Sequence, residues 1–162
     1  MLDTPSNASA STIVVGRLAA PDIVAMAQCI AIDVNAFPYP SSHFVFRPAV
    51  SPVWIARSAG ESRVLGFLAA SERRKLDLYL EGLATAVAAR RRGVGRALLR
   101  AAIHFAREMP AHTLSLHVWV GNVAAIELYR SEAFNVSLRV PRFYRHGTFA
   151  SSDAYRMVHV VA

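Results

Sequence analysis

A chain of 162 residues that is 54% hydrophobic and 18% charged suits one globular domain and lies far from the composition of disordered chains. Arg, Gly or Pro interrupts every apolar run before it reaches the roughly 20 residues that span a bilayer, so we expect a soluble, cytoplasmic protein. The formal net charge of +7 predicts an anionic partner: a nucleic acid, a membrane surface or a phosphate-bearing small molecule.

The N-terminal segment is small, polar and weakly acidic, with neither the basic start nor the apolar stretch of a secretory signal. We expect residues 1–11 to form a flexible tail and residues 12–162 to form a single domain. Cys29 is the only cysteine and lies in an apolar, helix-like run, which favours a buried thiol over a nucleophile.

The first elements are a strand, a helix and an irregular segment. Ser11–Leu18 has a strand pattern, and Pro21 with Asp22 suits the first turn of a helix that runs to about Asn35. Phe37–Phe44 follows with too much Pro, Ser and aromatic residues for a regular helix. This segment is a candidate substrate-facing loop.

Strand patterns then alternate with two helix patterns. The first helix is amphipathic, runs over Gly93–Met109 and ends at Pro110. Asn122 is a good N-cap for the second, Val123–Phe134. The strand patterns cover Pro52–Arg57, Arg63–Ser71, Lys75–Thr85, His112–Val120 and two segments near residues 134–142 and 155–161. This order predicts a mixed α/β domain in which a strand, a glycine loop and a helix follow one another.

The stretch VAARRRGVGRALL, residues 87–99, places three arginines before a Gly-x-Gly at the start of a helix. A helix N-terminus presents unpaired N–H groups and a partial positive charge, and therefore binds phosphates. Gly93 and Gly95 allow close approach of the backbone. Further positive charge comes from Arg90, Arg91, Arg92 and Arg96. The stretch predicts a site for a polyanionic ligand.

Known nucleotide loops do not explain this stretch. A Walker loop needs Lys and then Ser or Thr after its last glycine, where the chain has Arg96 and Ala97. A dinucleotide fingerprint needs a small residue where Leu98 stands. The alternative without a ligand is a solvated arginine loop whose glycines only close a turn.

The spacing Arg90-x-x-Gly93-x-Gly95 resembles the acyl-CoA loop of the GCN5-related N-acetyltransferase (GNAT) family. The downstream segment LSLHVWVGNVAAIELYRSEAF resembles the second block of that family, in which Asn122, Tyr129 and Phe134 match. Ala133 stands where the family has Gly and Glu132 where it has an apolar residue, which leaves the closing of the last helical turn open. The resemblance covers nearly the whole chain.

The resemblance implies an α/β fold with a mixed sheet of about six to seven strands, about four flanking helices and a splayed parallel strand pair. By position that pair is Leu80–Thr85 and Leu116–Val120. Acetyl-CoA would be the co-substrate, with its pyrophosphate on the glycine loop and its pantetheine arm between the strands. The implied cofactor-binding residues are Leu83, Ala84, Thr85, Arg90, Arg91, Arg92, Gly93, Val94, Gly95, Arg96 and Asn122.

Catalytic candidates also follow from the resemblance. Tyr129 would protonate the departing thiolate, the alternative being an aromatic residue that packs on the sheet. Glu81 holds the strand position that carries a proposed base in some relatives. His117 stands where the ribosomal-protein alanine acetyltransferase subfamily has a glutamate, and its ordinary pKa of about 6.5 suits a general base. A structural role for either residue, or a water as the base, stays open.

Aromatic residues mark the expected acceptor entrance. The segments AFPYPSSHF and RVPRFYRHG resemble parts of the ribosomal-protein alanine acetyltransferase subfamily. By that likeness the entrance is lined by Phe37, Tyr39, Phe143 and Tyr144, the alternative being a cover over the edge of the core. The histidines and Cys29 show no short ligand spacing, so we expect no metal.

The resemblance implies an N-acetyltransferase that moves an acetyl group directly from acetyl-CoA to a primary amine, either a peptide N-terminus, a lysine or a small amine. One alternative is a non-catalytic module that binds acyl-CoA or a partner protein on the same fold. A nucleic-acid binder is the second alternative, disfavoured because no aromatic residues are interleaved with the arginine run. We expect no membrane partner, and a homodimer is compatible with the resemblance.

Overall fold

A sheet of seven strands organises the molecule, whose computed structural model describes residues 12–20, 22–37, 51–74, 76–144 and 152–161. The strands lie in the order β1-β2-β3-β4-β5-β7-β6. Their bounds are β1 Ile13–Arg17, β2 Val53–Ser58, β3 Val64–Arg74, β4 Asp77–Thr85, β5 Thr113–Trp119, β6 Asn135–Val140 and β7 Ala154–Val160. All neighbouring strands are antiparallel except β4 and β5, which are parallel. The mixed sheet expected from the sequence is therefore confirmed.

The helices in the described part of the chain are α1 (Ile23–Ala36), α3 (Val94–Glu108) and α4 (Val123–Ser131), with a 3₁₀ turn η1 at Val87–Ala89. About four helices were expected, and the difference lies within the variation of the same fold. Asn122 caps α4 as predicted and accepts a hydrogen bond from the Ala125 N–H at 3.2 Å. Asp22, expected in the first turn of α1, is the N-cap of that helix and accepts from the Ala25 N–H at 2.9 Å. Within the described residues no helix is long and apolar enough to cross a membrane.

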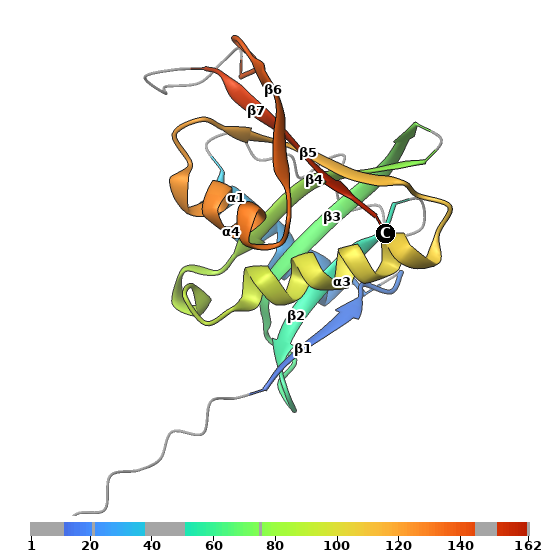
Figure 1. Cartoon of the computed structure of the whole chain (residues 1–162). Coiled ribbons are helices and arrows are strands. Elements are labelled where there is room, and N and C mark those ends of the chain that lie inside the picture. Colours follow the sequence, from blue (N-terminus) through green and yellow to red (C-terminus); the bar gives the residue numbers. More distant parts are fainter. Residues whose placement is uncertain (1–11, 21, 38–50, 75, 145–151, 162) are drawn as a thin grey trace, which may run out of the picture.

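Two apolar cores lie on the two faces of the sheet. Leu98 and Ala102 of α3 and Ile126 of α4 belong to one core, with strand residues such as Leu116. Cys29 of α1 belongs to the other and is fully buried, as the sequence indicated. Figure 1 accordingly shows α3 crossing the sheet on the near side and α1 on the far side. Because helices cover both faces of the sheet, the ends of its strands are the parts left uncovered.

The parallel strands separate soon after they pair. The register of β4 with β5 joins Asp77–Tyr79 to Thr113–Ser115, and both strands then continue without further pairing to each other. On its other edge β4 stays paired with β3 up to Thr85, with a shift in register where Ala69 opposes Gly82 and Ala70 opposes Leu80. Glu81 is thus the extra residue of a β-bulge. Bulges bend the strand that carries them, which explains why β4 diverges from β5 at this point.

Close packing of α3 on the sheet depends on Gly66 of β3. A Cβ atom at this position would lie 2.7 Å from the Ala84 carbonyl oxygen and 3.0 Å from Cγ1 of Val94. The first contact is with backbone and the second with the first residue of α3, so neither can yield cheaply. Glycine is therefore required for the start of α3 to lie directly above the end of β4.

Helix α4 ends in a Schellman motif. The Phe134 N–H donates to the Tyr129 carbonyl at 3.0 Å, and the Ala133 N–H donates to the Arg130 carbonyl at 3.1 Å. The Tyr129 and Phe134 rings lie 5.8 Å apart, the apolar contact typical of this motif. Ala133 has φ of +63°, in the left-handed region that favours glycine. The turn thus closes as a glycine would close it, with strain at the alanine.

Because Ala133 is strained, Ala133→Gly should stabilise the protein. A left-handed backbone costs an L-residue about 1–2 kcal/mol, which glycine avoids. Glycine in turn costs about 0.5–1 kcal/mol because it loses more conformational entropy on folding. We expect thermal unfolding to show Tm raised by about 2–4 °C. Ala27→Gly, in the exposed middle of α1, is the matched control and should lower Tm. A lowered Tm for Ala133→Gly as well would contradict the assignment of strain.

Candidate functional site

The loop between η1 and α3 turns back through two residues with positive φ. Arg91 has φ of +61° and Gly93, the N-cap of α3, has φ of +83°. Arg91 carries a Cβ in a conformation that costs of order 1–3 kcal/mol, and such strain gathers at ligand sites. The turn presents the unpaired N–H groups at the start of α3 together with the arginine side chains.

A cavity of about 580 Å³ opens where this loop meets the splayed strands. Its lining comes from the end of β4, the arginine loop, the first turn of α3 and the inner face of α4. The lining residues are Ala36, Phe37, Leu83, Ala84, Thr85, Ala89, Arg90, Arg91, Gly93, Val94, Gly95, Arg96, Asn122, Ala124, Ala125, Leu128 and Tyr129. Segments more than 40 residues apart in sequence thus form one wall.

The cavity gathers nearly every cofactor-binding residue expected from the sequence. Arg92 is the exception, since it is exposed and does not line the cavity. Phe37, expected at the acceptor entrance, lines this cavity instead. Tyr39 lies outside the described residues. A Cβ on Gly95 would lie 3.3 Å from Leu128 and 3.8 Å from Oγ1 of Thr85, so this glycine keeps the cavity floor open.

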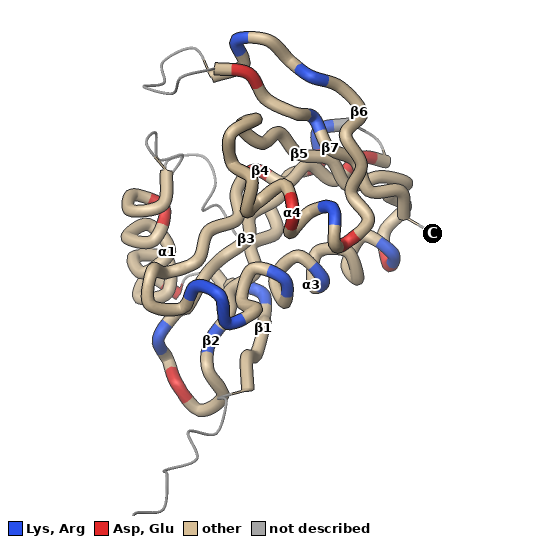
Figure 2. The backbone as a smooth tube through the Cα atoms, turned by 60° about the vertical axis from the view of Figure 1, so that its left-hand side comes forward, with Lys and Arg blue, Asp and Glu red and all other residues tan. Residues whose placement is uncertain are grey.

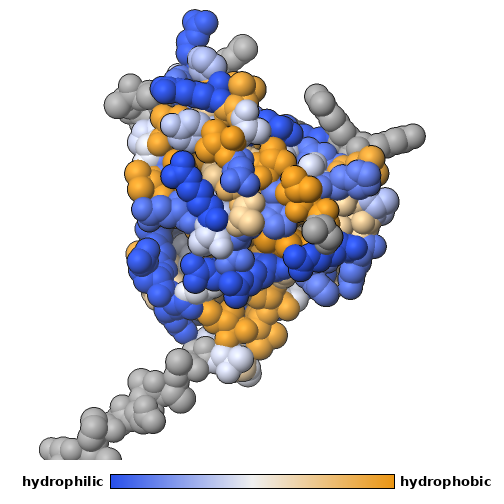
Figure 3. All heavy atoms as spheres, viewed as in Figure 1, coloured by the Kyte–Doolittle hydropathy of each residue, from blue (hydrophilic) through white to orange (hydrophobic). Residues whose placement is uncertain are grey.

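Positive charge surrounds the cavity mouth. Figure 2 shows arginines gathered in the loop before α3 and along α3 itself. In the space-filling view the loop and the exposed face of α3 form a hydrophilic band (Figure 3). Arg90, Arg91 and Arg96 all line the cavity and are exposed. Together with the positive end of α3 they favour an anionic ligand at this end of the cavity.

Tyr129 of α4 also lines the cavity. Only 9% of the residue is exposed, and no described residue forms a hydrogen bond with its hydroxyl. Burial is the main reason that its pKa is raised above the ordinary value, and the nearby Tyr144 and Tyr79 raise it further. A tyrosine hydroxyl is protonated at neutral pH with or without this shift, and the raised pKa makes it a weaker acid than an ordinary tyrosine.

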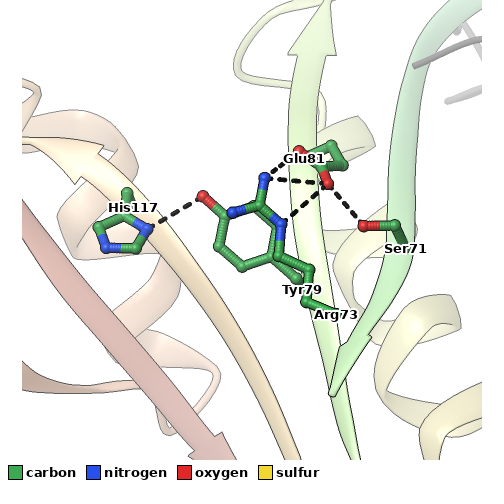
Figure 4. Close-up of polar contacts among 5 residues, drawn as sticks. All are labelled: Ser71, Arg73, Tyr79, Glu81 and His117. Atoms are coloured by element: carbon green, nitrogen blue, oxygen red, sulfur yellow. Dashed lines mark hydrogen bonds and ion pairs between the residues drawn. The ribbon is translucent and has the colours of Figure 1, made fainter. Parts of the chain in front are cut away.

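Beyond the gap between β4 and β5, polar side chains lie on the face of the sheet that carries α1. Glu81 accepts hydrogen bonds from Ser71 Oγ at 2.5 Å and from Arg73 Nη2 at 3.1 Å (Figure 4). Arg73 also lies over the Tyr79 ring, 3.7 Å from its centroid. Both carboxylate oxygens of Glu81 thus have donors, which is the structural alternative that the sequence left open.

His117 of β5 faces Tyr79 of β4 across the gap. The Tyr79 hydroxyl lies 3.0 Å from His117 Nδ1 (Figure 4). The imidazole also stacks on Phe143 with centroids 4.2 Å apart. Burial, and then the charges of Arg156 and Arg73, lower the pKa of His117 below its ordinary 6.5. The ring is therefore neutral at pH 7 and can accept a proton.

The cavity with Tyr129 and the polar group formed by Glu81, Tyr79 and His117 lie on either side of the gap between β4 and β5. Glu81 and His117 do not line the cavity, but Tyr79 and Tyr144 are close enough to Tyr129 to shift its pKa. Tyr144 contacts Phe143 edge-on, and burial raises its own pKa to about 12. The arrangement places a proton donor on one side of the gap and a proton acceptor on the other.

Sequence reasoning did not single out Tyr79 and Arg73. Tyr79 stands two residues before Glu81 in an alternating strand, so period-2 spacing places both on one face and was a usable signal. Arg73 lies on the neighbouring strand, and only the register of β3 with β4 brings it to Glu81. Within the described residues no group of three or more His, Cys, Asp or Glu could hold a metal ion.

Comparison with known proteins links this geometry to a family. Residues 17–134 match the family model described as the acetyltransferase (GNAT) family. This range includes the arginine loop, the splayed strands and Tyr129. Among curated proteins none matches the chain.

Solved structures share the fold at low sequence identity. The ribosomal-protein-S18-alanine N-acetyltransferase of Escherichia coli is 23% identical with a TM-score of 0.77, over 93% of this chain and 95% of that one. Arabidopsis thaliana NAA60 in complex with acetyl-CoA is 21% identical with a TM-score of 0.78, over 93% and 99%. Ard1 of Thermoplasma volcanium is 22% identical with a TM-score of 0.76, over 93% and 98%. At these identities the likeness establishes the fold.

The environment of His117 predicts a pKa change that NMR can measure. Arg156 is its cross-strand neighbour and lowers its pKa, so Arg156→Gln should raise that pKa towards 6.5. Titration of the imidazole C–H signals follows the midpoint directly. Arg107→Gln, an exposed change at the end of α3, is the control and should leave the midpoint in place. An unchanged midpoint in Arg156→Gln would contradict the electrostatic account.

Proposed function

The chain belongs to the acetyltransferase (GNAT) family, and from this we propose that it transfers an acetyl group from acetyl-CoA to a primary amine. The observation that carries the proposal is the cavity beside the splayed strands, which joins an arginine-rich helix start to a buried, protonated tyrosine. NAA60, with the same fold, has been solved with acetyl-CoA, which supports the choice of co-substrate.

The cavity suits a long thioester with a diphosphate at one end. N–H groups at the start of α3, with Arg90, Arg91 and Arg96, hold the diphosphate. The backbone of Leu83–Thr85 lines the cavity on the edge of β4 that β5 leaves free, so it can hydrogen-bond the pantetheine arm as a strand would. A backbone N–H on this edge can also polarise the thioester carbonyl. Asn122, at the start of α4, hydrogen-bonds the co-substrate.

The reaction needs one proton removed and one supplied. The amine nitrogen forms a bond to the acetyl carbon, the carbon–sulfur bond breaks, and the amine loses a proton. We assign that proton to Nε2 of His117, directly or through one water: the imidazole is neutral, and when its Nδ1–H donates to the Tyr79 oxygen, Nε2 is the nitrogen left to accept. Tyr129 gives its hydroxyl proton to the departing thiolate. Glu81 is the second candidate base, and its pairing with Arg73 favours a structural role.

An α-amino group is the acceptor that asks least of this site. With a pKa of about 7.7–8.0 it is roughly a tenth or more neutral at pH 7, whereas a lysine with a pKa of about 10.4 is neutral at about one part in 10³ to 10⁴. A neutral histidine suffices as the base for an α-amino group. The Escherichia coli enzyme of the same fold is a ribosomal-protein-S18-alanine N-acetyltransferase, which supports testing peptide N-termini first as acceptors.

Thiol release from acetyl-CoA, measured against peptides and small amines, tests the proposal. Tyr129→Phe should lower kcat by about 10²-fold, since a positioned acid contributes 10²–10⁴-fold, and should leave CoA binding within about twofold. Tyr155→Phe on β7 is the matched control and should keep full activity. If CoA binds tightly but no amine is acetylated, the chain is a non-catalytic acyl-CoA-binding module.

The pH dependence of kcat/KM separates the two candidate bases. If neutral His117 is required, the rate falls as the pH drops through its pKa, which lies below 6.5. His117→Ala should remove that limb and lower the rate at pH 7.5 by about 10²-fold. Glu81→Gln should keep the limb. If the acidic limb of the pH profile disappeared in Glu81→Gln and not in His117→Ala, Glu81 would be the general base.

A further inference from the structure

Glu132 stands at the end of α4 and reaches across to α3. Its side chain is 9% exposed, with Arg96 Nε 3.1 Å from one carboxylate oxygen and Arg100 Nε 2.9 Å from the other. The two arginines are one helical turn apart on α3, so the carboxylate connects both to the C-cap of α4. Nothing in the proton transfers described above uses this carboxylate.

Among the described residues, the contacts with Glu132 and Ser131 use only part of the donor capacity of Arg96. A guanidinium has five N–H donors. Arg96 Nε lies 3.1 Å from Glu132 Oε1 as an ion pair without hydrogen-bond geometry, and Nη2 donates to Ser131 Oγ at 3.3 Å. Ser131 Oγ itself donates to the Leu128 carbonyl at 2.7 Å. Nη1 takes no part in these contacts. Arg96 lines the cavity, whereas Arg100, bound to the same carboxylate, does not.

We propose that Glu132 is a positioning residue for the diphosphate of the co-substrate, because it holds the Arg96 guanidinium at the rim of the cavity before any ligand binds. The inference rests on the proposed function. A free arginine side chain loses rotamer freedom when it captures a phosphate, and an arginine already held by α4 loses less. The buried carboxylate needs its partners, so the arrangement is built into the fold.

The main competing account is that Glu132 weakens the binding of the diphosphate. A carboxylate beside Arg96 could compete with the diphosphate, and its removal would then tighten binding. Geometry favours positioning, because Glu132 lies against Nε, Ser131 accepts from Nη2, and Nη1 takes part in neither contact. The sign of the change in affinity therefore distinguishes the two accounts.

Isothermal titration of CoA into the full chain tests the inference. Glu132→Gln should raise Kd by about 3- to 10-fold, because the amide retains the size of the side chain but loses the ion pair. Arg100→Gln is the matched control: it breaks the other half of the same pair and should leave Kd within about twofold. An unchanged or lower Kd in Glu132→Gln, or an equal rise in Arg100→Gln, would overturn the inference.

A double-mutant cycle excludes a merely structural effect. Arg96→Gln should raise Kd by itself, and Glu132→Gln added to it should raise Kd little further. The KM for S-acetyl-pantetheine, which lacks the diphosphate, should be the same in Glu132→Gln and in the wild type. Additive losses, or an equal loss with S-acetyl-pantetheine, would refute positioning. If the wild type itself does not bind CoA, the proposed function fails first, which a Kd measured on the wild type alone reveals.

Discussion

Separation of β4 from β5 is the constraint on which the site depends. The strands pair over three residues each, and the bulge at Glu81 then bends β4 away while β3 keeps its other edge paired. Backbone groups on the free edge need partners, and in a closed sheet β5 would supply them. The cavity is lined by this free edge, by the start of α3 and by Tyr129.

The gap also separates two electrostatic environments. On the side of α3, arginines and the helix N-terminus make the surroundings of the cavity positive. On the other face, Arg73 is paired with Glu81, and Asp77 accepts hydrogen bonds from Thr113 and Ser115. Burial lowers the pKa of His117 and raises that of Tyr129, so at neutral pH the imidazole is neutral and the hydroxyl is protonated. A polyanion and an amine can therefore approach the same gap from different sides without competing for the same charges.

Patterns local in sequence were the most predictable part of the structure. Asn122 caps α4 as expected, and α3 begins at Val94, one residue after the predicted start at Gly93. Contacts between strands were harder to foresee, since the partners of Glu81 depend on the register of β3 against β4. The bulge itself has no local signature beyond Gly82. The ion pairs of Glu132 likewise require the packing of α4 against α3, which a single sequence does not encode legibly.

Gly66 does not line the cavity, yet the lack of space above it makes this residue decisive for the shape of the cavity. Its backbone is covered by the Ala84 carbonyl and by Val94, which both line the cavity. Any side chain there pushes the first turn of the helix outward and the end of the strand sideways, so the two walls lose their alignment together. Substitutions at this buried strand position would thus act on affinity for the nucleotide end of the ligand as well as on folding, although the residue belongs to neither wall.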